Sequence, residues 1–253
     1  MHYDYRAGKK RIDEILGSKM AVVEKDRLPK NDELTFDNSY LSWISAIFID
    51  IRESTKLMAR DDQEYVAKVV RCFTSELIEI LRGEDNLREI GIRGDCVYAV
   101  YTTPYQEDIL DLFTLAAWCN SYLNMINTIL QARGLDEIRA GIGLAVGHDH
   151  IIKAGRKGVD INAHVWMGKA VSTASKLSGY GQKKSHRRIW MSSLFYENII
   201  DLVVKQSGEQ AREWFSRSSG EPYGCYQCNV IMPELEEWIS NGMEQVRRAW
   251  GLS

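Results

Sequence analysis

The sequence predicts an α+β fold whose core is a split βαβ, ferredoxin-like arrangement: a mostly antiparallel sheet with long helices packed on one face. Three observations lead to this prediction. Short apolar runs bounded by turn residues alternate with two long stretches of helical periodicity. Their order along the chain is strand, helix, strand, strand, helix, strand. No linker-like break in composition divides them, so we expect one elaborated domain.

Each element follows from a local pattern. Apolar runs predict strands at residues 43–51, 87–92, 96–101 and 138–146, and a tight turn at Gly94-Asp95 joins the middle two. Apolar residues at helical spacing predict one long helix over residues 54–81. A second long helix carries apolar residues from Ile109 to Leu130 and stops at Arg133-Gly134. A shorter helix is expected over residues 168–177.

The segment His148-Asp149-His150 invites interpretation as a metal site, because both histidines would point the same way on a strand. No third ligand accompanies them in the sequence. We therefore expect this segment to be a polar loop that follows the fourth strand.

Length and composition limit the domain organisation and the classes of function. We expect an N-terminal extension over residues 1–40, with a short helix at 12–16, and a domain with a C-terminal elaboration over residues 41–253. The net charge of −3 argues against a general nucleic-acid-binding protein. No run of about 18 apolar residues predicts a membrane span, and the first residues lack a secretory h-region. A cytoplasmic protein with five reduced cysteines is expected.

Two acidic residues stand at matching places in this topology. Asp50 ends the first strand, and Asp95 lies in the turn between the second and third strands. The first and third strands are central neighbours in a split βαβ sheet, so the two carboxylates should lie close together. Two carboxylates beside a helix N-terminus are the ingredients of a two-metal phosphoryl-transfer site. The alternative is that each is an ordinary turn or capping acid.

Four motifs in this order and spacing resemble the class III nucleotidyl cyclase domain. They are FIDIREST (48–55), IRGDCVYAVY (92–101), RAGIGLAVG (139–147) and GKAVSTASKL (168–177). The resemblance implies that Asp50, Asp95 and the main-chain carbonyl of Ile51 bind two divalent metal ions, Mn²⁺ or Mg²⁺. It also implies that the backbone from Ile51 to Thr55 holds the triphosphate. Phe48, Ser54 and Thr55 of the first motif are therefore expected at the nucleotide.

The chain departs from the family pattern at four positions. Gly91 and Val165 stand where purine-specific cyclases carry their base-reading side chains. Ser172 and Lys176 stand where the family has an asparagine and an arginine that stabilise the transition state. The four-residue spacing still places both on one helix face, and lysine still supplies a positive charge. These departures resemble the pyrimidine cyclases of the bacterial Pycsar anti-phage systems.

That resemblance implies an enzyme that converts UTP, or alternatively CTP, to the 3′,5′-cyclic monophosphate and pyrophosphate. The product would be a second messenger that signals infection to a separate effector protein. A head-to-tail homodimer is implied, with the metal acids from one chain and Ser172 and Lys176 from the other. Two competing hypotheses are a catalytically degenerate cyclase fold that senses nucleotide and an adenylyl cyclase with a rearranged base pocket.

Several residues are candidates for contact with the base. Arg93 lies two positions before Asp95 and can reach a carbonyl oxygen or a phosphate from the same strand face. Phe36, ahead of the first strand, can stack on a small base. Tyr40 and Trp166 are alternative stacking residues, and each of the three aromatic side chains can equally belong to the core or to an interface.

Overall fold

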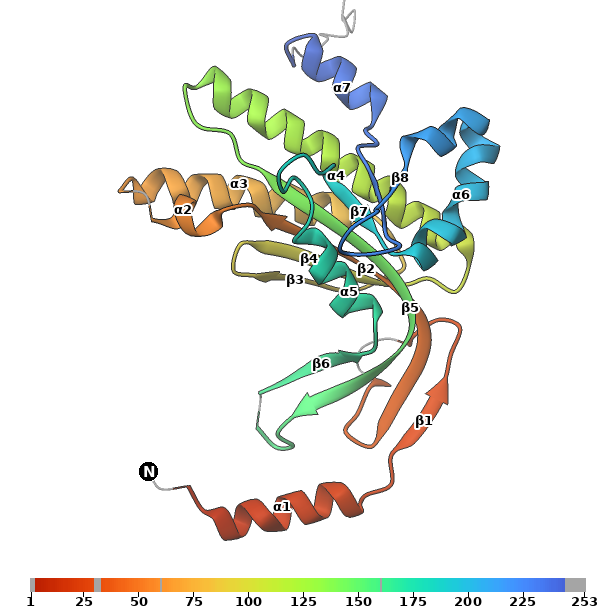
Figure 1. The fold of residues 1–253 in the computed structure, drawn as a ribbon. Helices are drawn as coiled ribbons and strands as arrows, with labels where there is room; N and C mark the ends of the chain where they lie inside the picture. The colour runs from red at the N-terminus through yellow and green to blue at the C-terminus, as the bar shows by residue number, and fades with distance from the viewer. Residues whose placement is uncertain (1–2, 30–32, 60, 160, 244–253) are drawn as a thin grey trace, which may run out of the picture.

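A computed structural model describes residues 3–29, 33–59, 61–159 and 161–243 (Figure 1). Its centre is a mixed sheet in which neighbouring strands follow the order β3-β4-β2-β5-β7-β9-β8. The first four of these are β3 (Leu87–Arg93), β4 (Cys96–Thr102), β2 (Asn38–Ile51) and β5 (Ala140–Gly155). All three pairings among these four strands are antiparallel. This is the split βαβ order, so the predicted fold class is confirmed.

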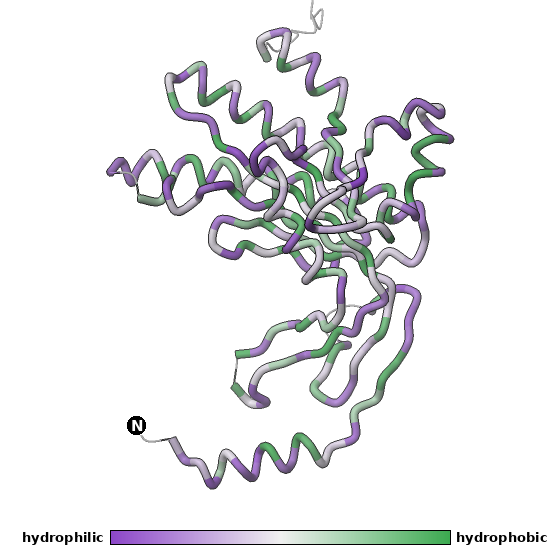
Figure 2. The backbone as a smooth tube through the Cα atoms, in the orientation of Figure 1, coloured by the Kyte–Doolittle hydropathy of each residue, from purple (hydrophilic) through white to green (hydrophobic). Residues whose placement is uncertain are grey.

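The two long helices cover one face of the sheet. They are α3 (Gln63–Leu81) and α4 (Gln106–Ala132). Inward-facing side chains of β2 and β4, such as Ile47, Ile49 and Val97, pack against Phe73 and other buried residues of these helices. Figure 2 shows the hydrophobic segments gathered where the helices and the sheet meet. The strand alternation in β2 and the helical periodicity therefore meet in one large core.

The helix expected over residues 54–81 is interrupted, which corrects the prediction. A short helix, α2 (Ser54–Met58), ends before α3 begins at Gln63. The side chain of Asp62 caps α3 by accepting a hydrogen bond from the backbone N–H of Tyr65 at 2.9 Å. An N-cap aspartate satisfies otherwise unpaired N–H groups, which favours a new helix start at this position.

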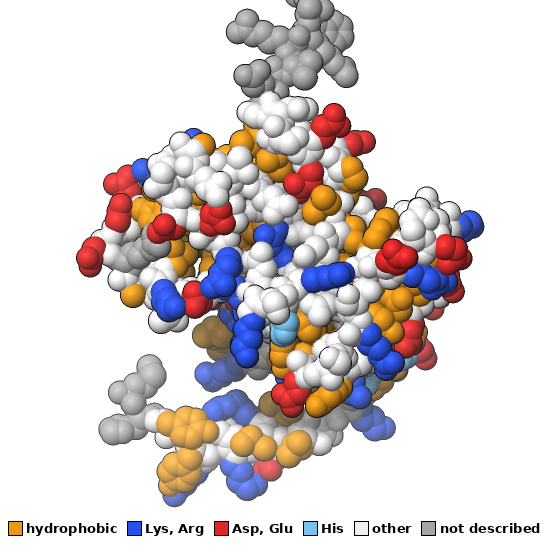
Figure 3. Space-filling view, turned by 45° about the horizontal axis from the view of Figure 1, so that its top comes forward, with side chains coloured by type: hydrophobic (Ala, Val, Ile, Leu, Met, Phe, Trp, Pro, Cys, Tyr) orange, Lys and Arg blue, Asp and Glu red, His pale blue; other side chains and the backbone are white. Residues whose placement is uncertain are grey.

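The N-terminal region continues into the sheet. The helix expected at residues 12–16 is longer, α1 (Tyr5–Gly17), and β1 (Ala21–Glu24) pairs in parallel with the start of β2. That start, at Asn38, lies five residues before the predicted one. Residue 40 therefore lies inside a strand, and the division into an extension and a domain stays a prediction. Along α1 several apolar side chains are exposed, as the lower part of Figure 3 shows; they include Tyr5, Ile12, Ile15 and Leu16.

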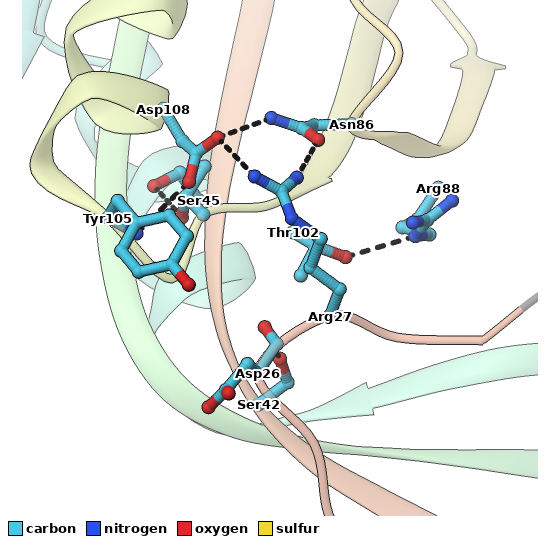
Figure 4. A network of polar contacts seen from close by, with 10 residues as sticks. Asp26, Arg27, Ser42, Ser45, Asn86, Arg88, Thr102, Tyr105 and Asp108 are labelled. Atoms are coloured by element: carbon cyan, nitrogen blue, oxygen red, sulfur yellow. Dashed lines mark hydrogen bonds and ion pairs between the residues drawn. The ribbon is translucent and has the colours of Figure 1, made fainter.

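A polar network fastens the segment after β1 to the body of the fold (Figure 4). The guanidinium of Arg27 donates to the side chains of Asn86 and Asp108, the latter at 3.1 Å. Asp108 is almost fully buried and also accepts from the side chain of Asn86 and the backbone N–H of Tyr105. A buried carboxylate that has several donors holds its partners in place, so Arg27 anchors this segment at the start of α4.

Strand β5 is far longer than expected, and His148-Asp149-His150 lies within it. The prediction of a polar loop there was wrong, because residues 148–150 pair with residues 41–43 of β2. Beyond this point β5 turns back into β6 (Asn162–Met167), with which it pairs in an antiparallel hairpin. The loop was predicted because Asp149 is polar, but its carboxylate is buried by hydrogen bonds with Lys169 and Ala170, which lie 20 and 21 positions away in sequence.

The helix expected over residues 168–177 is α5 (Ala170–Ser178), and it lies on the face opposite α3 and α4. Small residues of α5 and outward-facing side chains of β2 and β4 form a second core cluster. The C-terminal elaboration adds further short elements to the sheet edge and the helical layer. They are β7 (Ile189–Met191), α6 (Ser193–Ser207), the 3₁₀ helix Glu209–Trp214, β8 (Ser216–Arg217), β9 (Tyr226–Cys228) and α7 (Pro233–Ser240).

Candidate active site

The two predicted metal acids lie side by side. Asp50, near the end of β2, pairs with Cys96, the first residue of β4, and Asp95 directly precedes that residue. The backbone N–H of Ile51 donates to the carbonyl oxygen of Asp95 at 3.4 Å. Gly94, with φ of +64°, makes the turn that presents Asp95. The topology therefore brings together the carboxylates that the sequence analysis paired.

The electrostatics of Asp50 reflect this proximity. Burial raises the pKa of the Asp50 carboxyl, and the negative charge of Asp95 raises it further. The guanidinium of Arg52 acts in the opposite direction through an ion pair and a hydrogen bond with Asp50. Two neighbouring carboxylates that disfavour each other's ionisation gain from a cation between them. The pair suits a divalent metal ion in this respect.

Few side chains are available as ligands for a metal ion at this site. Among the described residues no group of three or more His, Cys, Asp or Glu side chains could hold a metal ion. The expected set contains only two carboxylates, Asp50 and Asp95, and is completed by the main-chain carbonyl of Ile51. Hard cations such as Mg²⁺ and Mn²⁺ accept this mixture of oxygen ligands and take their remaining ligands from substrate phosphates.

The turn after Asp50 is fixed by contacts that the sequence analysis missed. The backbone N–H of Arg52 donates to the carbonyl of Arg139 at 2.7 Å, and the Arg52 side chain donates to the carbonyl of Gly179 at 2.7 Å. Glu53 adopts a left-handed conformation with φ of +55° and accepts from Arg139 at 2.8 Å. Ser54 and Thr55 follow in the first turn of α2, where backbone N–H groups lack intrahelical partners.

The position of Arg52, two residues after Asp50 in the first motif, is the sequence signal that could have identified it. Its side chain is largely buried, and its guanidinium links the end of β2 to the end of α5. Its positive charge lowers the pKa of Asp50, against the effects of burial and of Asp95. A positive group in this place offsets part of the repulsion between the two acids when metal is absent.

Ser172 and Lys176 lie on the exposed face of α5, as the four-residue spacing predicted. The hydroxyl of Ser172 donates within its own helix, to the carbonyls of Gly168 and Lys169. Both side chains therefore face away from the body of their own chain and are accessible to another molecule. Their roles in catalysis stay a prediction.

The other expected nucleotide contacts divide into two groups. Phe48 lies on the same face of β2 as Asp50, and Arg93 is exposed at the end of β3, opposite Cys96. Phe36 lies at the far end of β2, where its ring contacts the ammonium of Lys153. Twelve strand residues separate that end from Asp50, roughly 40 Å of chain if straight. Within one chain, Phe36 is therefore not brought to the metal acids.

The alternative base contacts are also separated. Tyr40 is buried near the start of β2, whereas Trp166 extends from β6 to the side chain of Glu89 on β3. Val165 is exposed on the opposite side of β6 from Trp166. Gly91 lies on β3 directly opposite Tyr98 of β4. The structure does not assign a base-reading role to any of these residues.

The buried carboxylate of Asp149 holds the start of α5. Its two oxygens accept from the backbone N–H groups of Lys169 and Ala170 at 2.9 and 2.8 Å. Because α5 carries Ser172 and Lys176, this cap places the candidate catalytic side chains relative to the sheet. A carboxylate at a helix N-terminus both satisfies unpaired donors and complements the helix dipole.

Removing this cap should weaken the attachment of α5. In Asp149→Ala we expect the free energy of unfolding to fall by about 1–3 kcal/mol, because two buried N–H groups lose their acceptor. Thermal unfolding followed by circular dichroism measures the loss. Asp13→Ala serves as a control, since Asp13 makes only an exposed ion pair within α1. Equal stability of both variants would show that the cap is dispensable.

Comparison with known proteins identifies the family of the chain. The family model described as the adenylate and guanylate cyclase catalytic domain matches residues 37–201. A uridylate cyclase from Treponema porcinum is 40% identical over 247 residues, covering 96% of this chain and 83% of the relative. A uridylate cyclase from Gulbenkiania mobilis is 33% identical over 212 residues, covering 81% and 82%.

Solved structures of cyclases share the fold. A crystal structure of an adenylyl cyclase from P. aeruginosa superposes with a TM-score of 0.61 at 17% identity, covering 75% of this chain and 95% of that chain. A class III adenylyl cyclase-like ATP-binding protein from Pseudomonas aeruginosa gives 0.64 at 17% identity, covering 92% and 48%. The family match and the identity to these relatives show that the chain belongs to the adenylate and guanylate cyclase catalytic domain family.

Proposed function

We propose that this protein is a uridylate cyclase that converts UTP to 3′,5′-cyclic UMP and pyrophosphate. The observation that carries the proposal is the proximity of Asp50 and Asp95 where the central strand β2 ends and β4 begins. The two relatives named uridylate cyclase support the choice of UTP over CTP. The intact pair of acids also favours an enzyme over a nucleotide sensor, which has little need of two metal-binding carboxylates.

Each candidate residue has a distinct part in this mechanism. Asp50, Asp95 and the carbonyl of Ile51 would hold two divalent ions, Mn²⁺ or Mg²⁺. When bound, these ions lower the pKa of the ribose 3′-hydroxyl and neutralise charge on the phosphates. The N–H groups of Ser54 and Thr55 bind phosphate oxygens, and Arg93 contributes a further positive charge. The 3′-oxygen attacks the α-phosphorus, and pyrophosphate leaves.

We further propose that the active form is a head-to-tail homodimer. Ser172 and Lys176 point outward from their own chain, which supports a site that takes the metal acids from one chain and α5 from the other. Lysine would stabilise the charge on the pentavalent phosphate, and serine would donate a hydrogen bond to it. A two-fold dimer of this kind contains two equivalent sites.

Mixing two inactive variants tests the shared site. Asp50→Asn and Lys176→Ala should each lose activity alone, whereas their mixture should recover about a quarter of the wild-type rate, because half of the dimers are mixed and each contains one intact site. Production of cyclic UMP after subunit exchange measures the recovery. A mixture of Asp50→Asn and Asp95→Asn is the control, since both acids come from the same chain. Recovery in the control, or none in the test mixture, contradicts the arrangement.

The nature of the product decides the main proposal. Purified protein is incubated with each of ATP, GTP, CTP and UTP in the presence of Mn²⁺, and separately with Mg²⁺, and the products are separated by chromatography. Cyclic UMP from UTP is the expected result. Cyclic CMP would replace uridylate by cytidylate cyclase, and a cyclic purine nucleotide would overturn the pyrimidine assignment. Nucleotide binding without product would favour the sensor.

We propose that the cyclic nucleotide is a second messenger in bacterial anti-phage defence and that it acts on a separate effector protein. Among the helices of the described residues, none has the length and apolarity to cross a membrane. The nucleoside triphosphate substrate is a cytoplasmic metabolite, so we propose that the enzyme acts there.

A further inference from the structure

On the sheet face that carries Asp50, α5 covers β2 and β5. Ala170 and Ala174 of α5 pack over β2 and β5, in a cluster with Ile44 and Ala46. Beyond β2, the same face continues over β4 and β3. For a nucleotide whose phosphates lie at Asp50 and the turn that follows, β4 and β3 are the part of this face on the side away from α5.

Tyr98 is the first large side chain in that direction. It lies on β4 directly opposite Phe48, and the two rings stack with 5.1 Å between centroids and an interplanar angle of 13°. On its other side, Tyr98 faces Gly91 of β3. A Cβ atom at Gly91 would lie 2.8 Å from the Tyr98 ring, too close for any real side chain. The ring therefore fills the space above Gly91.

The position of the Tyr98 ring is fixed by Glu89. The Tyr98 hydroxyl donates to one carboxylate oxygen of Glu89 at 2.7 Å, and the indole N–H of Trp166 donates to the other at 2.8 Å. Only about a fifth of the Glu89 side chain is exposed. Charge-assisted hydrogen bonds to both oxygens hold this carboxylate in one orientation. The three residues connect β4, β3 and the β5–β6 hairpin through side chains.

We propose that Tyr98 is a specificity-determining residue that excludes purine bases by occupying the volume their second ring needs, and that Glu89 and Trp166 position it. This inference rests on the proposed cyclase function and adds the basis of its choice of base. Uracil has a single ring and needs less of the sheet face than adenine or guanine. Selection by volume requires no charged group that hydrogen-bonds to the base. A purine is disfavoured because its second ring would overlap the Tyr98 ring.

The geometry also explains why the ring stays in place. Phe48 supports one face of Tyr98, and stacked aromatic pairs gain stability beyond the area they bury. Rotating the ring out of the way would break its hydrogen bond to Glu89 and expose the nearly buried ring of Phe48. A purine nucleotide could therefore bind only by disrupting both contacts. Tyr98 thus resists displacement as well as filling space.

Substitutions at Tyr98 test the inference. Tyr98→Ala and Tyr98→Leu remove the ring, and Tyr98→Phe keeps the ring but loses the hydroxyl. We expect kcat/KM for ATP to rise in Tyr98→Ala, and the UTP to ATP ratio of kcat/KM to fall by about 10- to 100-fold. Tyr98→Leu should give a smaller change in the same direction. Tyr98→Phe should keep most of the preference for UTP, and Trp166→Phe should lie between wild type and Tyr98→Leu.

The controls separate this inference from the proposed function. Tyr223→Ala, at an exposed tyrosine, should leave the ratio unchanged. Cyclic UMP from wild type establishes the function independently of the variants. A folded Tyr98→Ala or Tyr98→Leu protein with an unchanged ratio would overturn the inference, as would a wild-type enzyme that uses ATP and UTP equally well. If Tyr98→Ala does not fold, Tyr98→Leu alone decides, with ATP binding by calorimetry as the second readout.

Discussion

Asp50→Asn should lose about a thousandfold or more of the cyclase activity while the protein stays folded. Asparagine keeps the size of the side chain and one oxygen but removes the charge that a divalent cation needs. The loss of one metal-binding carboxylate removes several kcal/mol of charge stabilisation in the transition state. Asp95 then has no second carboxylate beside it with which to share a cation.

Two measurements separate a chemical defect from a structural one. Thermal unfolding in the absence of metal should show no loss of stability, and Mn²⁺ binding, followed by electron paramagnetic resonance, should weaken. Asp85→Asn is the matched control, since Asp85 is exposed in the turn between α3 and β3. A variant at Asp50 that retains wild-type activity would remove the carboxylate pair from the mechanism and with it the main support for the proposed function.

Gly143→Ala should be the most damaging substitution of a single methyl group. In the structure, a Cβ atom at Gly143 would overlap the backbone carbonyl of Ala174 and the backbone N–H of Ser178. Backbone atoms cannot rotate away, so α5 must move from the sheet. We expect a loss of about 2–3 kcal/mol in the free energy of unfolding and a decrease of about 5–10 °C in Tm.

Activity should fall more steeply than stability. A displacement of α5 by about 1 Å moves Ser172 and Lys176 and can cost about a hundredfold in rate. Thermal unfolding and initial rates with saturating UTP measure the two effects. Gly17→Ala, at a glycine with no atom near the added methyl group, is the control. If Gly143→Ala matches wild type in both measurements, close packing of α5 on β5 is unimportant for the site.

The sequence was sufficient for the central topology and for the proximity of Asp50 and Asp95. Alternating apolar residues in β2 and helical spacing in α3 and α4 are local signals, and the split βαβ order follows from their succession. The neighbourhood of Asp50 and Asp95 then follows from the topology alone. The break between α2 and α3 was missed, because residues 60–64 (RDDQE) contain no glycine or proline and only the cap at Asp62 marks the new start.

Interactions between distant segments were beyond the reach of the sequence patterns. The buried Asp149 looks like a loop residue until α5 is placed against β5. The link from Trp166 through Glu89 to Tyr98 joins residues up to 77 positions apart, and no local periodicity encodes it. Phe36 was expected at the base because it precedes the strand that carries Asp50, but the length of β2 separates the two.

The contact of α5 with the sheet has a consequence for how this enzyme can change over evolution. Gly141 and Gly143 in β5 lie so close to the backbone of α5 that an added methyl group would overlap it, so this contact leaves little room for larger residues. The outer surface of α5, which bears Ser172 and Lys176, is exposed and can accept side chains of other sizes. Residues on the outer surface of α5 can therefore change without moving the helix, so catalytic side chains can be exchanged while the fold stays the same.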